Sequence, residues 1–202
     1  MRDADNIHAV AQLGVDLMGF IFYPKSPRYV ERIPARTEAD KNIRRVGVFV
    51  NADEEYIMQR VKAFDLDVIQ LHGAESREYC LQIKRALEKA GKHIDLIKAI
   101  SIKDVSDVQR YKDYVGVVDY LLFDTKCKTM GGSGIQFDWS VLDTYDGDIP
   151  FLLSGGIGPD DVERVRNFHH PKCIGIDLNS KFEIEPALKD VEKLKAFIVK
   201  SL

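Results

Sequence analysis

The chain has 202 residues, of which 45% are hydrophobic and 30% charged, with a formal net charge of −3. This composition is typical of a globular protein with a substantial core, and the charge disfavours nucleic acid as a partner. No apolar run reaches the roughly eighteen residues of a membrane span, and the first residues lack a signal-peptide pattern.

Seven short apolar runs alternate with helical patterns along the chain. Most of these runs are apolar at consecutive positions rather than at alternate ones, which is typical of strands covered on both faces, as in parallel sheets. We therefore predict seven strands. They fall within residues 16–23, 44–51, 67–73, 95–101, 119–125, 150–156 and 173–179.

Amphipathic helices are predicted between these runs. Segments 7–14 and 80–87 place apolar residues at the i, i+3, i+4 and i+7 spacing of a helix. Asp138 is placed to cap a helix over 139–145, and the Gly158-Pro159 pair is suited to start another. A last amphipathic helix is predicted from about residue 189 to residue 202.

Repeated strand–helix units predict an α/β protein built from βα units. The pattern starts and ends with a helix, so seven strands accompany eight helices. A closed eight-stranded barrel has no free edge. The simplest interpretation is one (βα)8 TIM-barrel domain over residues 1–202 whose first strand would precede Met1. An open doubly wound sheet, with helices on both faces, is the alternative.

In such barrels the active site lies at the C-terminal ends of the strands. Two glycine-rich loops, 131–134 and 154–158, follow the strands within 119–125 and 150–156 and precede helix starts. Glycine lets backbone N–H groups approach an anion closely, so we expect the two loops to share a phosphate. Ordinary turns are the other interpretation of each loop taken alone.

Three other side chains are candidates at the same end. Asp124 ends an apolar strand, where partial burial favours the protonated form that a general acid needs, although it could instead cap a turn. Arg28 could bind a carboxylate in bidentate fashion or be a solvated surface charge. His72 could face the pocket or act as a structural donor. Lys98, inside a strand, is more consistent with an amphipathic role than with a Schiff base.

The combination of FYPKSPR (22–28), QLHG (70–73), FDT (123–125), GGSG (131–134) and LSGG (153–156) resembles the phosphoribosylanthranilate isomerase family of tryptophan biosynthesis. The matching segments occur in order along nearly the whole chain. The resemblance implies a (βα)8 barrel and an Amadori rearrangement that needs no cofactor. In it, N-(5′-phosphoribosyl)anthranilate becomes 1-(2-carboxyphenylamino)-1-deoxyribulose 5-phosphate.

The resemblance also implies roles for individual residues. Asp124 would be the general acid that protonates the furanose ring oxygen, and Arg28 would contact the anthranilate carboxylate. A general base would remove the C2′ proton. The expected substrate-binding residues are Arg28, His72, Gly132, Ser133, Gly134, Ser154, Gly155, Gly156, Asp177 and Asn179. The expected partner is a small phosphosugar, with no nucleic acid, membrane or metal, and with the protein as a monomer or homodimer.

Two features depart from the family pattern. The family places its basic cysteine in a Lys-x-Cys-Gly motif on the first strand, and this sequence has no such motif. Its scattered cysteines (Cys80, Cys127 and Cys173) lie elsewhere and favour a reducing, cytoplasmic compartment over a disulfide framework or zinc site. Lys181 replaces a glycine of the family pattern and would be strained if that position needs a positive φ.

Three hypotheses follow. The favoured one is the isomerase, with residues 1–202 alone weak or inactive because the base is missing. The second is a phosphate-ligand-binding barrel that has lost its base and is not catalytic. The third is another enzyme on the same barrel, such as a metal-dependent pentose-phosphate epimerase or indole-glycerol-phosphate synthase, whose metal ligands or catalytic lysine and glutamates the sequence does not offer at its strand ends.

Overall fold

A computed structural model describes residues 1–38, 40–125 and 138–201. Its main element is a seven-stranded parallel sheet whose strands are paired in the order of the sequence. The strands are β1 (Leu17–Ile21), β2 (Arg44–Phe49), β3 (Val68–Leu71), β4 (Asp95–Ile102), β5 (Tyr120–Thr125), β6 (Phe151–Ser154) and β7 (Cys173–Ile176). All seven predicted strands are confirmed.

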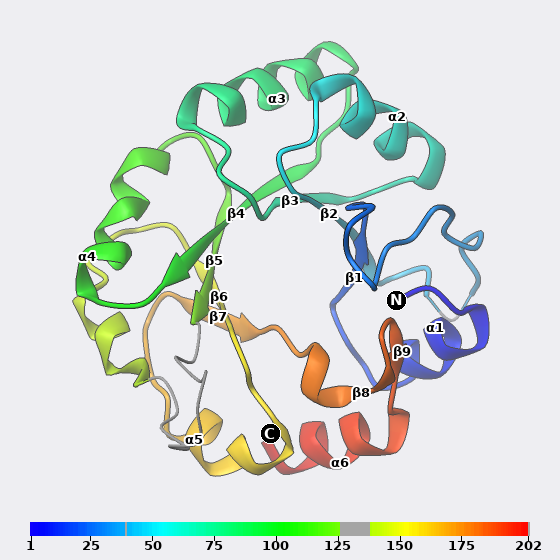
Figure 1. Cartoon of the computed structure of the whole chain (residues 1–202), viewed down its shortest axis with the longest axis vertical. Coiled ribbons are helices and arrows are strands. Elements are labelled where there is room, and N and C mark those ends of the chain that lie inside the picture. The colour runs from blue at the N-terminus through cyan, green and yellow to red at the C-terminus, as the bar shows by residue number, and fades with distance from the viewer. Residues whose placement is uncertain (39, 126–137, 202) are drawn as a thin grey trace.

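The sheet curls in the middle of the molecule, and the helices surround it (Figure 1). A doubly wound sheet would instead carry helices on both of its faces and reverse its strand order at one point. Sequential order and an outer helix layer therefore support the barrel architecture and rule out that alternative.

The helices of the described residues include short 3-10 segments as well as α-helices. The α-helices are α1 (Ala4–Ala11), α2 (Glu54–Phe64), α3 (Arg77–Lys89), α4 (Val105–Val108), α5 (Val162–Arg166) and α6 (Val191–Ser201). The 3-10 segments are η1 (Gln109–Tyr114), η2 (Trp139–Thr144), η3 (Pro159–Asp161) and η4 (Ser180–Phe182). None of the helices described combines the length and apolar character that crossing a bilayer requires.

The predicted helix starts are confirmed, with one difference in helix type. The Asp138 side chain accepts a hydrogen bond from the Ser140 backbone N–H, but the segment that it caps is the 3-10 helix η2 rather than an α-helix. Pro159 occupies the first turn of η3, which continues into α5. Helix α3 buries Cys80, Ile83 and Leu87, the three positions that its apolar spacing predicts.

Two apolar layers explain why the strands read as continuous apolar runs. A large core fills the space between the sheet and the helices. A smaller cluster, Val46, Val68, Ile97, Ala99 and Leu122, comes from β2 to β5 and lies on the opposite, inner face of the curled sheet. Because alternate residues of a strand share a face, the strand positions that follow these residues by two also face inward.

The ring of elements is completed by contacts outside the sheet. Within the described residues, no backbone pairing joins β7 to β1. Helix α1 contacts α6 and a short antiparallel hairpin, β8 (Glu183–Glu185) and β9 (Leu188–Lys189), which the sequence did not predict. The Asn6 side chain donates to the Lys189 carbonyl and accepts from its N–H, both at 2.8 Å. The additional first strand stays a prediction.

Candidate active site

Three polar side chains lie in register at the C-terminal ends of neighbouring strands. Ser101 of β4 is opposite Asp124 of β5, and Asp124 is opposite Ser154 of β6. Ser101 and Asp124 each follow an inner-face residue, Ala99 and Leu122, by two positions. The predicted acid therefore lies on the inner face of the sheet, at the end where the active site of such a barrel forms.

His72 lies beside Asp124. Its Nε2 atom is 3.5 Å from Asp124 Oδ2, and the two side chains remain 32% and 20% exposed. On the other side of the ring, the Gln70 amide nitrogen is 2.8 Å from His72 Nδ1. The sequence left the direction of His72 open, and the structure turns it toward the predicted acid. Gln70 was missed, although it follows the inner-face residue Val68 of β3 by two positions and precedes His72, just beyond the end of that strand, by two.

A buried ion pair holds the loop that follows His72. Lys98 Nζ is 3.1 Å from Glu75 Oε2, and each side chain is only 2% exposed. Lys98 also donates to the carbonyl oxygens of Leu71 and Gly73, which flank His72. Glu75 accepts from the backbone N–H groups of Asn51 and Gly73. Lys98 is therefore a structural cation, and burial lowers its pKa although Glu75 opposes that effect.

The ends of β6 and β7 are joined by side-chain and backbone bonds. Ser154 Oγ donates to Asp177 Oδ2 at 2.9 Å, and the Asp177 N–H donates to the Leu153 carbonyl. Ser154 leads directly into Gly155 and Gly156, whose φ angles are 102° and 68°. Side chains disfavour such positive φ values, so this turn requires glycine. The turn predicted to bind phosphate is thus next to the strand position opposite Asp124.

Arg28 is engaged by a carboxylate of the protein itself. Its Nε and Nη2 atoms donate to Glu183 Oε2 at 2.8 and 2.6 Å. Lys189 Nζ lies 3.3 Å from Glu183 and donates to Asn179 Oδ1 at 2.7 Å. Burial alone would raise the pKa of Glu183, but Arg28 and Lys189 outweigh it and the pKa is lowered. Arg28 is therefore an anchored cation rather than a freely solvated one, and its partner Glu183 was not predicted.

Other candidates are placed as follows. Gly132, Ser133 and Gly134 lie outside the described residues. Lys181 belongs to η4, and the non-glycine residues with positive φ that the structure describes are Asn51, Asp65 and Ala187. The backbone strain considered for Lys181 therefore does not arise.

The two cysteines that the structure describes lie away from Asp124. Cys80 is buried on α3, where burial raises the pKa of its thiol to about 11. Cys173 begins β7, at the opposite end of the strand from Asp177, and burial raises its pKa as well. Neither is placed to supply the base that the family pattern expects. Among the described residues, no three His, Cys, Asp or Glu side chains gather in a way that could hold a metal ion.

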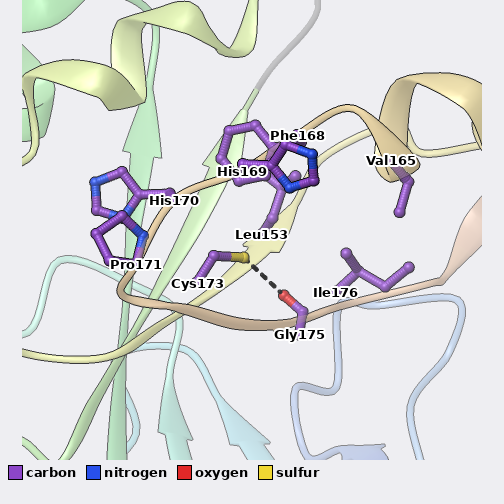
Figure 2. A pocket seen from close by; sticks show the side chains of 9 residues that line it. All are labelled: Leu153, Val165, Phe168, His169, His170, Pro171, Cys173, Gly175 and Ile176. Atoms are coloured by element: carbon purple, nitrogen blue, oxygen red, sulfur yellow. Dashed lines mark hydrogen bonds between the residues drawn. The ribbon is translucent and has the colours of Figure 1, made fainter.

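A cavity of about 500 Å³ lies outside β6 and β7 (Figure 2). It is lined by Leu153, Val165, Cys173, Gly175, Ile176 and residues 168–171. Cys173 Sγ is 3.5 Å from the Gly175 carbonyl oxygen within it. Leu153 and Cys173 belong to the core between sheet and helices, not to the inner cluster. The cavity is therefore on the helix side of the sheet, apart from the row of polar strand ends.

Comparison with known proteins identifies the family. The model of the family described as N-(5'phosphoribosyl)anthranilate (PRA) isomerase matches residues 1–200. A protein named N-(5'-phosphoribosyl)anthranilate isomerase from Parabacteroides distasonis is 50% identical, and the match covers 98% of this chain and 89% of that protein.

Solved structures agree with this match. The phosphoribosyl anthranilate isomerase of Thermotoga maritima superposes with a TM-score of 0.79 at 30% identity, covering all of this chain and 95% of its own. A phosphoribosyl anthranilate isomerase in complex with reduced 1-(O-carboxyphenylamino)-1-deoxyribulose 5-phosphate gives a TM-score of 0.76 at 29% identity, with 98% and 93% coverage. The chain belongs to the N-(5′-phosphoribosyl)anthranilate isomerase family.

Proposed function

We propose that this protein converts N-(5′-phosphoribosyl)anthranilate to 1-(2-carboxyphenylamino)-1-deoxyribulose 5-phosphate in tryptophan biosynthesis. One observation supports the proposal most directly. Asp124 is in register with Ser154, and Ser154 is followed at once by the glycine turn at Gly155 and Gly156. A proton donor and an anion-binding turn are thus neighbours, as a small sugar phosphate requires.

Asp124 supplies the acid chemistry in this proposal. Protonation of the furanose ring oxygen by its carboxyl group opens the ring to an iminium ion. Loss of the C2′ proton then gives an enolamine, which collapses to the ketone. A positioned acid typically contributes about 10²–10⁴ to the rate. Inner-face placement and 20% exposure suit Asp124 to meet the sugar while remaining partly shielded from water.

Two anionic groups of the substrate need separate sites. The phosphate is assigned to the backbone N–H groups of Gly155 and Gly156, together with those of 132–134. The anthranilate carboxylate is assigned to Arg28. Glu183 takes Nε and one side of Nη2, and within the described part of the chain no acceptor is recorded for Nη1. The edge formed by Nη1 and Nη2 is therefore available for a second, bidentate carboxylate.

Proton removal from C2′ requires a base. The two cysteines that the structure describes, Cys80 and Cys173, lie away from Asp124. Turnover is therefore measured separately from ligand binding. The protein is further proposed to act in the cytoplasm as a single barrel domain, either as a monomer or as a homodimer.

Binding and turnover test the proposal separately. Purified protein is titrated calorimetrically with reduced 1-(2-carboxyphenylamino)-1-deoxyribulose 5-phosphate, with inorganic phosphate as competitor, and turnover of N-(5′-phosphoribosyl)anthranilate is followed by chromatography. Saturable binding that Arg28→Ala weakens supports the assigned site. Absence of binding overturns it. Binding without turnover, even when a first strand bearing the cysteine motif is supplied, would favour the non-catalytic barrel.

A further inference from the structure

We propose that Gln70 is a positioning residue that holds His72 as the neutral imidazole with its proton on Nε2, directed at Asp124. The geometry of the ring stands on its own, whereas the catalytic consequence rests on the function proposed above. Neither the family match nor the motif that contains both residues specifies this arrangement.

Contacts on both sides of the ring select the same tautomer. The Gln70 amide nitrogen, 2.8 Å from His72 Nδ1, carries only protons and must donate. Nδ1 therefore presents its lone pair. On the opposite side, Nε2 faces Asp124 Oδ2 at 3.5 Å, and this oxygen can only accept whenever the carboxyl group is ionised or carries its proton on Oδ1. An Nε2–H imidazole satisfies both neighbours without a positive charge.

Gln70 is buried between two neighbouring strands of the sheet. Gln70 is only 8% exposed and is flanked in register by Val48 of β2 and Ile97 of β4. The main chain on either side of His72 is bound by Lys98, through the carbonyl groups of Leu71 and Gly73. Rotating the imidazole by 180° would put the Cδ2–H group in place of Nδ1 and leave the Gln70 amide without its acceptor, so the arrangement disfavours the flipped ring.

A neutral donor beside the acid serves the proposed chemistry. Before the reaction, a neutral imidazole does not draw Asp124 into a permanent ion pair, so the carboxyl group can carry the proton that it must deliver. After the transfer, the Nε2–H group can hydrogen-bond the new carboxylate at Oδ2. An imidazolium in the same place would stabilise the ionised acid from the start.

The ring nitrogen resonances of ¹⁵N-histidine-labelled protein report the tautomer directly. The signals of His72 are assigned by their loss in His72→Asn. We expect an Nε2–H pattern in the native protein, no fixed preference in Gln70→Met, and an Nδ1–H or doubly protonated ring in Gln70→Glu, whose carboxylate must accept. Gln59→Glu is the matched control. Gln59 is exposed on α2, and within the described residues its side chain hydrogen-bonds to that of Glu55.

Kinetics connect the ring to the reaction. In protein with measurable turnover, Gln70→Met should lower kcat about 10- to 100-fold, the scale of a misplaced catalytic group, with little change in KM. An Nδ1–H or doubly protonated His72 in the native protein near pH 7 would overturn the proposal. So would a native tautomer that persists in both Gln70 variants. The ring resonances are measured without substrate. A protein with the native tautomer and no turnover would therefore contradict the proposed function and leave the tautomer assignment intact.

Discussion

Removing the charge of Lys98 tests the buried pair that supports the loop after His72. Lys98 and Glu75 are each 2% exposed and lie 3.1 Å apart. In Lys98→Met the methionine fills much of the space of the lysine stem, but Glu75 becomes a buried carboxylate without its cation. The loop also loses the two hydrogen bonds from Lys98 to the carbonyls of Leu71 and Gly73.

The magnitude follows from the cost of an uncompensated buried charge. Breaking one partner of a buried pair typically costs about 3–5 kcal/mol, against a total stability of roughly 5–15 kcal/mol for a domain. The double variant Lys98→Met with Glu75→Gln removes both charges, and its amide oxygen still accepts from the main chain. It should be more stable than Lys98→Met alone by at least about 1 kcal/mol, within the range of coupled neighbours.

Urea unfolding, followed by the fluorescence of the single tryptophan and by circular dichroism, measures these differences. A deficit below about 1 kcal/mol, or one unchanged by Glu75→Gln, would refute the view that this pair is fully desolvated.

Three further predictions concern the acid, the glycine turn and the opposite end of the sheet. Asp124→Asn should lower kcat/KM by about 10²–10⁴ while leaving the urea midpoint nearly unchanged, and retention of a tenth of the activity would contradict its role as acid. Gly156→Ala, at φ 68°, should cost about 1–2 kcal/mol, whereas Gly158→Ala, at φ −128° where a methyl group would meet only ordinary van der Waals contacts, should cost less; equal losses would argue against a glycine-only turn. Burial raises the pKa of Asp40, but a main-chain hydrogen bond and Arg45 lower it from 3.8 to about 2. This carboxylate therefore stabilises the fold by about 2 kcal/mol above pH 4, and that contribution disappears as pH falls through 2, so the deficit of Asp40→Asn should shrink in acid unfolding measurements.

The strands could be predicted from the sequence because both of their faces are buried. Val46 and Val68 pack inside the curled sheet, while neighbouring residues such as Ile69 pack against the helices, so apolar residues follow one another without a gap. The position of Asp124 follows from the same rule. Once its strand is known, the end of that strand and the facing side are fixed by the two-residue period.

The partners of the site residues could not be predicted in this way. Glu183 is 155 positions from Arg28 and Glu75 is 23 positions from Lys98, so no local pattern links either pair. The hairpin of β8 and β9 is too short to leave a periodic signal. The cap at Asp138 suits either kind of helix, so it does not distinguish the 3-10 form of η2 from an α-helix.

Charge is arranged differently at the two ends of the sheet. At the N-terminal end, cations and carboxylates are closely paired: Arg44 lies 2.6 Å from Asp95, and Arg45 lies 2.9 Å from Asp40. Such closed pairs hold strand starts and have little left to offer a ligand. At the C-terminal end, within the described residues, the basic side chain beside Asp124 is His72, whose Nε2 atom lies 3.5 Å from Asp124 Oδ2.

This difference supports the proposed placement of the chemistry at the C-terminal end. A carboxyl group locked to an arginine stays ionised and cannot deliver a proton, whereas one beside a neutral donor can exist in both forms. Stability and proton transfer therefore place opposite demands on a carboxylate, and the fold meets them with different residues at different ends of the same strands. Asp40→Asn should accordingly change the unfolding free energy without changing the affinity for the product analogue. Asp124→Asn should lower turnover and leave the unfolding free energy nearly unchanged.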